Sequence, residues 1–201
     1  MAVRHGRTAW NATGRFQGQT DVPLDDEGRA QARSVAALLA GERFDLAVAS
    51  DLSRARETAA IVLGERAEPA IETDERWREM RFGTWEGLVW DEIVARQPEL
   101  AERSSTTPRF YTPPGGESFD DLCARIADAL AALAARVPDG GRALLATHAG
   151  PLHALLRVAL GQSEADALQV RFSPASVTRL AFGPGGARVT DLNRTALGAA
   201  P

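Results

Sequence analysis

The sequence predicts an α/β fold: a three-layer α/β/α sandwich with a mostly parallel central sheet and a small cap insertion. Short apolar runs alternate with longer segments whose apolar residues recur every three or four positions, so strands alternate with helices. The chain has 201 residues, 44% hydrophobic and 25% charged, which suits one globular domain. We therefore expect a single domain over residues 1–201, with the cap at roughly 74–117.

Composition narrows the functions open to this chain. The formal net charge is −4, which argues against nucleic acid as a partner, because such domains usually carry a basic face. No run approaches the length of a membrane helix and the N-terminus has no signal pattern, so we expect a cytoplasmic protein without a membrane partner. The single Cys123 excludes an internal disulfide. The three histidines lack metal-ligand spacing, so we expect no metal and no cofactor.

The first strand is expected to be very short, because only residues 1–3 precede the stretch Arg4-His5-Gly6-Arg7-Thr8-Ala9-Trp10-Asn11. An imidazole beside a guanidinium, in a loop that leaves a strand, suits an anion that is both bound and attacked. Arg offers a planar fork to phosphate oxygens, and His is a nucleophile near neutral pH. Gly6 lets the backbone approach closely. Taken alone, this dipeptide is also compatible with a solvated turn.

The next elements follow in alternation. Asp25 is expected to cap a helix that runs to about Gly41, and residues 46–49 form a buried strand. A helix then begins within residues 50–59. Arg54 would lie in its first turn, where the helix dipole and the guanidinium both favour an anion. Residues 70–72 are expected to be the third strand.

An irregular stretch follows, with helical and Pro-broken segments at residues 89–111. Ser118 is expected to cap a long helix ending near Arg136, with Cys123 as a small buried residue in it. Residues 143–147 form a buried strand that is followed by His148 and a helix. Residues 176–182 and 188–193 form a hairpin at a sheet edge around a Gly-Pro-Gly-Gly turn.

Three groups of polar residues lie just past strand ends: Arg4-His5, Arg54 and His148. The carboxyl ends of parallel strands lie at one edge of a sheet. We therefore expect these side chains to converge on one rim.

The first motif resembles that of the histidine phosphatase superfamily, also called the phosphoglycerate mutase-like family. Its signature is Arg-His-Gly followed by Thr and Asn, and the likeness continues through residues 14–18 and 21–24 and along nearly the whole chain. Arg7 departs from the pattern, because the family often has Glu or Gln there. We therefore expect extra positive charge at the mouth of the pocket.

The resemblance also implies roles for later residues. Arg54 matches the second phosphate-binding Arg of the family, and His148, followed closely by Gly150, matches its fourth motif. In residues 77–88, Glu79 matches the proton donor, whereas Glu86 belongs to a Trp-Glu-Gly structural signature. Two other residues are expected outside this machinery, Arg56 as a surface charge and His153 as a core or rim residue.

The implied reaction begins with attack of neutral His5 on phosphorus, which gives a phosphohistidine. Arg4, Arg54 and His148 hold the phosphoryl oxygens, while Glu79 protonates the leaving alkoxide and then activates water. The expected catalytic residues are His5, Glu79, His148, Arg4 and Arg54. The expected substrate-binding residues are Arg4, Asn11, Gln17, Gly18, Arg54, Glu79, His148 and Ala149.

Three functions are compatible with these residues: a metal-independent phosphatase, a phosphoglycerate mutase, which is an isomerase, and a non-catalytic protein that binds phosphorylated ligands. The run from Met80 to Trp85 after the acidic residue favours the phosphatase branch. Within that branch the chain looks most like the bacterial glucosyl-3-phosphoglycerate phosphatases, although broad-specificity and α-ribazole-type relatives share much of the pattern. The expected substrate is a small phosphorylated metabolite, and a homodimer is left open.

Overall fold

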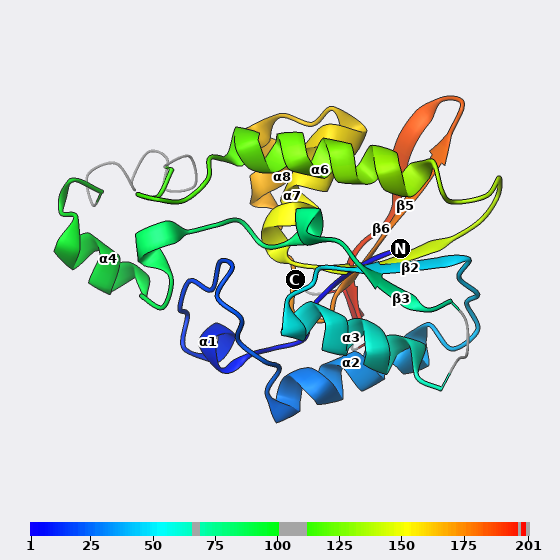
Figure 1. Cartoon of the computed structure of the whole chain (residues 1–201), viewed down its shortest axis with the longest axis horizontal. Coiled ribbons are helices and arrows are strands. Elements are labelled where there is room, and N and C mark those ends of the chain that lie inside the picture. Colours follow the sequence, from blue (N-terminus) through cyan, green and yellow to red (C-terminus); the bar gives the residue numbers. More distant parts are fainter. Residues whose placement is uncertain (66–68, 101–111, 197, 200–201) are drawn as a thin grey trace.

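A computed structural model describes residues 1–65, 69–100, 112–196 and 198–199. Within these residues one seven-stranded sheet has the order β3-β2-β4-β1-β5-β6-β7 (Figure 1). Strands β3, β2, β4 and β1 run parallel to one another, so the sheet is mostly parallel, as predicted. Strand β5 runs antiparallel to both β1 and β6. The strands are β1 (Ala2–Arg4), β2 (Leu46–Ala49), β3 (Ile71–Thr73), β4 (Ala143–Thr147), β5 (Val177–Gly183), β6 (Gly186–Thr195) and β7 (Gly198–Ala199).

Helices cover both faces of the sheet, which confirms the predicted three layers. Figure 1 shows α2 and α3 on one side of the strands and α6, α7 and α8 on the other. The helices are α1 (Ala9–Ala12), α2 (Asp26–Leu38), α3 (Ser53–Leu63), α4 (Trp90–Arg96), α6 (Phe119–Ala134), α7 (Ala149–Leu160) and α8 (Glu164–Gln169), with short 3₁₀ turns η1 (Glu75–Trp77) and η2 (Gly83–Trp85). In the part of the chain described, no helix is long and apolar enough to cross a membrane.

The alternation of side chains along the strands divides the core in two. Successive residues of a strand point to opposite faces, so each buried strand supplies both cores. One core, against α6, α7 and α8, includes Ala2, Leu46, Val48 and Leu145. The other, against α2 and α3, includes Val3, Ala47 and Leu144. Strands buried on both faces explain the continuous apolar runs in the sequence.

Most predicted boundaries lie close to the observed ones. The side chain of Asp25 accepts a hydrogen bond from the Gly28 amide at the start of α2, and Ser118 forms a capping box with Asp121 at the start of α6. Helix α2 ends at Leu38 rather than near Gly41, because Leu39 already leaves the helical conformation. The sequence reading missed α1 and α8, which are too short for apolar periodicity to show. The Ser163 cap of α8 was a usable signal.

The stretch between β3 and α6 has its own small apolar cluster. Trp85, Ile93 and Leu100 are buried there and pack with Phe16 and Phe82 from the loops beside them. The interpretation of residues 74–117 as a cap stays a prediction. The part of the predicted Pro-broken segment at residues 101–111 lies outside the described residues.

Candidate active site

The carboxyl ends of three neighbouring strands form the base of the site. Strand β4 lies between β2 and β1, and in the register Arg4 pairs with Thr147 while Ala49 pairs with Ala146. The residues just past these strand ends therefore lie together. The rings of His5 and His148 are 5.0 Å apart between centroids, and Arg54 Nε lies 3.2 Å from His148 Nδ1.

His5 is held as one neutral tautomer. Its side chain is buried, and Nδ1 lies 2.7 Å from the carbonyl oxygen of Gly6. A carbonyl only accepts, so Nδ1 carries the proton and Nε2 keeps its lone pair. Burial, followed by the charges of Arg54 and Arg4, lowers the pKa of His5 well below its ordinary value. The Gly6 position has no room for a side chain, because a Cβ there would lie 2.3 Å from the Gly28 carbonyl oxygen.

His148 is held as the opposite tautomer. The guanidinium of Arg54 only donates, so His148 Nδ1 accepts and Nε2 carries the proton. This Nε2 is buried and has no hydrogen-bond partner among the described residues. Burial, followed by the charge of Arg54, lowers the pKa of His148 well below its ordinary value. A buried N–H without a partner is costly, which favours an acceptor supplied by a ligand.

The two guanidiniums are fixed by backbone carbonyls. Arg54 is fully buried and donates from Nη1 to Thr20 O at 2.9 Å and from Nη2 to Gly18 O at 2.7 Å. Arg4 donates from Nη1 to the Phe172 carbonyl, while its buried Nε has no partner in the described part of the chain. Burial lowers the pKa of both side chains, and the nearby Glu79 partly offsets this. Arg remains charged at neutral pH despite such shifts.

Glu79 presents one carboxyl oxygen to the backbone. Its Oε1 accepts from Met80 N at 2.8 Å and from Gly150 N at 2.9 Å, near the start of α7. Neither bond uses Oε2, which leaves that oxygen to hold a proton. Burial raises the pKa of Glu79 above its ordinary value, against these hydrogen bonds and the charges of Arg54 and Arg4. Ala149, the first residue of α7, places the helix N-terminus beside this carboxyl.

Two amide side chains are oriented by Thr8. Asn11 Oδ1 accepts from Thr8 N at 3.1 Å, and Gln17 Oε1 accepts from the Thr8 hydroxyl at 3.0 Å. Because the oxygens are engaged, the NH₂ groups are the ends that remain to donate to a ligand.

Most of the predicted site residues line one cavity of about 250 Å³, whereas His148 and Ala149 are not in its lining. The lining residues are Arg4, His5, Asn11, Gly14, Arg15, Phe16, Gln17, Gly18, Arg54, Glu79 and Phe82. Gly14, Arg15, Phe16 and Phe82 were not among the predicted site residues. The signal that marked them was their position in or next to the matching motifs. The expected role of Arg7 was wrong, because its side chain pairs with Asp25 at 2.9 Å and does not line the cavity.

Other candidates separate clearly from the cavity. Glu86 accepts from Gln19 N, Thr20 N and Phe82 N, so its carboxylate is used to hold a loop. The ring nitrogen Nε2 of His153 lies 2.8 Å from the Val170 carbonyl oxygen. Cys123 is buried in α6, as expected. Within the described ranges no group of three or more side chains could hold a metal ion.

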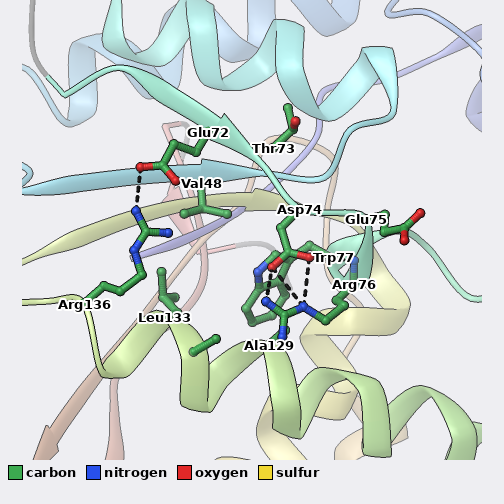
Figure 2. Close-up of a pocket in the computed structure, with 11 residues that line it drawn as sticks. Val48, Glu72, Thr73, Asp74, Glu75, Arg76, Trp77, Ala129, Leu133 and Arg136 are labelled. Atoms are coloured by element: carbon green, nitrogen blue, oxygen red, sulfur yellow. Dashed lines mark hydrogen bonds and ion pairs between the residues drawn. The ribbon is translucent and has the colours of Figure 1, made fainter.

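A second pocket of about 380 Å³ lies between β3 and α6 (Figure 2). Its charged side chains are already paired: Arg136 with Glu72 at 2.5 Å and Arg76 with Asp74 at 2.7 Å. The cavity around His5 is the candidate active site, because the predicted nucleophile, the predicted acid and both predicted phosphate-binding arginines line it.

Comparisons with known proteins agree with the family resemblance seen in the sequence motifs. The family model described as the histidine phosphatase superfamily (branch 1) matches residues 1–195. The chain is 37% identical over 166 residues to a metal-independent phosphoserine phosphatase of Arabidopsis thaliana, covering 81% of this chain and 69% of that protein. It is 40% identical over 164 residues to a glucosyl-3-phosphoglycerate phosphatase of Mycobacterium tuberculosis, covering 77% of this chain and 72% of that protein. A solved structure of the mycobacterial glucosyl-3-phosphoglycerate phosphatase in complex with VO₃ has a TM-score of 0.85 and 34% identity, covering 96% of each chain.

Proposed function

The chain belongs to the histidine phosphatase superfamily, and from this premise we propose that it hydrolyses phosphomonoesters of small metabolites through a phosphohistidine intermediate. The observation that carries the proposal is the tautomer of His5. Its Nε2 lone pair lies in a cavity that also contains two guanidiniums. A neutral imidazole in a cationic cavity is what attack on a phosphate dianion requires.

The first half of the reaction transfers the phosphoryl group to the protein. His5 Nε2 forms a bond to phosphorus, and the bond between phosphorus and the ester oxygen breaks. Arg4, Arg54 and His148 Nε2–H bind the phosphoryl oxygens, with the amides of Asn11 and Gln17 as further donors. The unpartnered N–H groups on Arg4 and His148 support this role, because a phosphoryl oxygen would satisfy them. The remaining binding residues, Gly18 and Ala149, act through their backbone.

Glu79 donates a proton in the first half of the reaction and accepts one in the second. It gives its proton to the leaving alkoxide, and in the second half it takes a proton from a water molecule that attacks the phosphohistidine. The bond from Nε2 to phosphorus then breaks, which releases phosphate and restores protonated Glu79. The raised pKa of Glu79 supports the first step, because it keeps the proton on the carboxyl at higher pH than usual. No step needs a divalent cation.

The substrate class follows from the relatives. Two of them are, by name, phosphatases of phosphoserine and of glucosyl-3-phosphoglycerate, both small phosphorylated metabolites. We propose that residues 74–117 form a cap insertion within the domain. A cytoplasmic location, a homodimer and mutase activity stay predictions from the sequence.

A phosphate-release assay on purified protein tests the function. The substrates are phosphoserine, glucosyl-3-phosphoglycerate, sugar phosphates and 3-phosphoglycerate, each with and without a chelator. We expect phosphate release from at least one of them, unchanged by chelation and abolished in His5→Ala. Isomerisation of 3-phosphoglycerate that depends on a bisphosphate primer would assign a mutase instead. Binding of these compounds without turnover would leave only a binding protein.

A further inference from the structure

One arginine outside the cavity holds the loop that carries Glu79. Arg125 projects from α6 and donates from Nη1 to the carbonyl oxygens of Arg76 at 2.7 Å and Arg78 at 2.8 Å. Its Nη2 donates to the carbonyl oxygen of Glu79 itself at 3.0 Å. A single guanidinium thus binds three carbonyls of one irregular segment. Arg125 does not line the cavity, so its hydrogen bonds act on the reaction through this segment. Its charge also contributes to the lowered pKa of His148, after burial and Arg54, and a lysine at this position would keep that charge.

A buried carboxylate fixes that guanidinium. Glu117 is only 8% exposed and lies 2.6 Å from Arg125 Nη2 and 3.1 Å from Nε, a bidentate pair. Glu117 Oε1 also accepts from Arg81 N at 2.9 Å, and Glu117 N donates to Arg81 O at 3.0 Å. The pair therefore connects the backbone on both sides of Glu79 to the N-terminal part of α6.

The arrangement matters because the segment has little regular structure to hold it. Residues 78–82 lie between two short 3₁₀ turns and belong to no helix or strand, so no regular hydrogen-bond ladder fixes the backbone that carries Glu79. A general acid must lie within hydrogen-bond reach of the atom that it protonates, so small displacements of this loop reduce its effect.

We propose that the Arg125–Glu117 pair is a positioning device for the general acid, with Arg125 as the positioning residue. This inference rests on the proposed function, in which Glu79 protonates the leaving group. The planar fork of Arg is required, because lysine is a compact point charge that cannot donate to three carbonyls and a carboxylate from one rigid plane.

The test uses the ratio of two rates, which does not depend on how much of the protein is folded. Single-turnover phosphorylation is measured with glycerol phosphate, whose alkoxide needs a proton, and with p-nitrophenyl phosphate, whose phenolate does not. For Arg125→Lys we expect the loss with glycerol phosphate to exceed the loss with p-nitrophenyl phosphate by about 10-fold, a part of the 10²–10⁴ that general acids contribute. The matched control is Arg136→Lys, since Arg136 pairs with the exposed Glu72.

Equal losses with the two substrates would overturn the inference and leave Arg125 a purely structural residue. Glu79→Gln is measured beside it. If that variant shows the leaving-group dependence and Arg125→Lys does not, the inference fails while the proposed function stands. If Glu79→Gln shows none, the acid of the proposed function is wrong and the inference fails with it. If Arg125→Lys does not fold, the double variant Arg125→Met with Glu117→Gln takes its place. It removes both charges together, so no buried charge is left unpaired, and its loss with glycerol phosphate must exceed its loss with p-nitrophenyl phosphate by the same factor.

Discussion

At the scale of single residues, hydrogen bonds assign different roles to two similar histidines. A carbonyl holds the proton on Nδ1 of His5, whereas a guanidinium holds it on Nε2 of His148. One ring therefore presents a lone pair and the other presents a donor. This division follows from one neighbour on each ring: Gly6, just past β1, and Arg54, in the first turn of α3.

His5 is expected to carry the phosphoryl group. A phosphoramidate to histidine is cleaved by acid and survives base, in contrast to a serine ester. Base quench after mixing with ³²P-labelled substrate should give a labelled protein, and acid treatment should release the label. His5→Ala should give no label. A label that survives acid would point to a hydroxyl nucleophile and contradict the assignment.

Glu79→Gln should slow single-turnover phosphorylation by about 10² to 10⁴-fold with alkyl phosphates, the usual contribution of a general acid. The loss with p-nitrophenyl phosphate should be clearly smaller. In the unmodified protein, the rate with alkyl phosphates should fall as pH rises through the pKa of Glu79, which burial raises, because the carboxyl then loses its proton. The Glu79→Gln variant should not show this fall of the rate with pH.

The control for this experiment is Glu75→Gln, since that side chain is 75% exposed and pairs only loosely with Arg78 at 3.7 Å. Equal losses for the two leaving groups in Glu79→Gln would mean that another residue supplies the proton.

At the scale of elements, the loop at residues 18–20 connects Glu86 to the guanidinium of Arg54. Carbonyls of Gly18 and Thr20 hold Arg54, while the amides of Gln19 and Thr20 donate to Glu86. Gly18 has φ +53°, and a Cβ there would lie 2.1 Å from Glu86 Oε1. The loop can approach this carboxylate only because residue 18 has no side chain.

Glu86→Ala should weaken phosphate binding without affecting protonation of the leaving group. Removing the carboxylate frees the loop that orients Arg54, at a cost of about 1–2 kcal/mol, or roughly 5- to 30-fold in affinity. KM and the inhibition constant for inorganic phosphate should rise together, and by the same factor with alkyl and nitrophenyl substrates. Asp91→Ala, in the first turn of α4, is the control. A selective loss with alkyl phosphates would instead make Glu86 part of the acid machinery.

At the scale of the whole molecule, the buried ionisable groups of the site affect the free energy of unfolding. Two histidines are buried with pKa values well below the ordinary one, and one carboxyl is buried with a raised pKa. Each of these groups binds protons differently in the folded and unfolded states, so the free energy of unfolding must depend on pH.

That free energy should fall as pH drops below about 6.5, where the unfolded histidines take up protons and the folded ones do not. Each histidine contributes at most about 1.4 kcal/mol per pH unit. Glu79 acts in the opposite sense, because its folded form keeps a proton that the unfolded form loses, and offsets part of this. Urea unfolding at several pH values between 5 and 8 should show a flatter dependence for His5→Gln with His148→Gln than for the unmodified protein. An unchanged slope would mean that these histidines titrate alike in both states.

The sequence by itself determined the layers, the helix caps Asp25 and Ser118, and the convergence of Arg4-His5, Arg54 and His148. These follow from local rules: apolar periodicity, capping side chains and the shared edge of parallel strands. Only the tertiary structure decided which protons the histidines carry, where Arg7 points and what holds Glu79. Those depend on partners far along the chain, such as Arg125 for the Glu79 loop and Phe172 for Arg4. A spacing rule has no access to such contacts, because they form only when separate elements pack together.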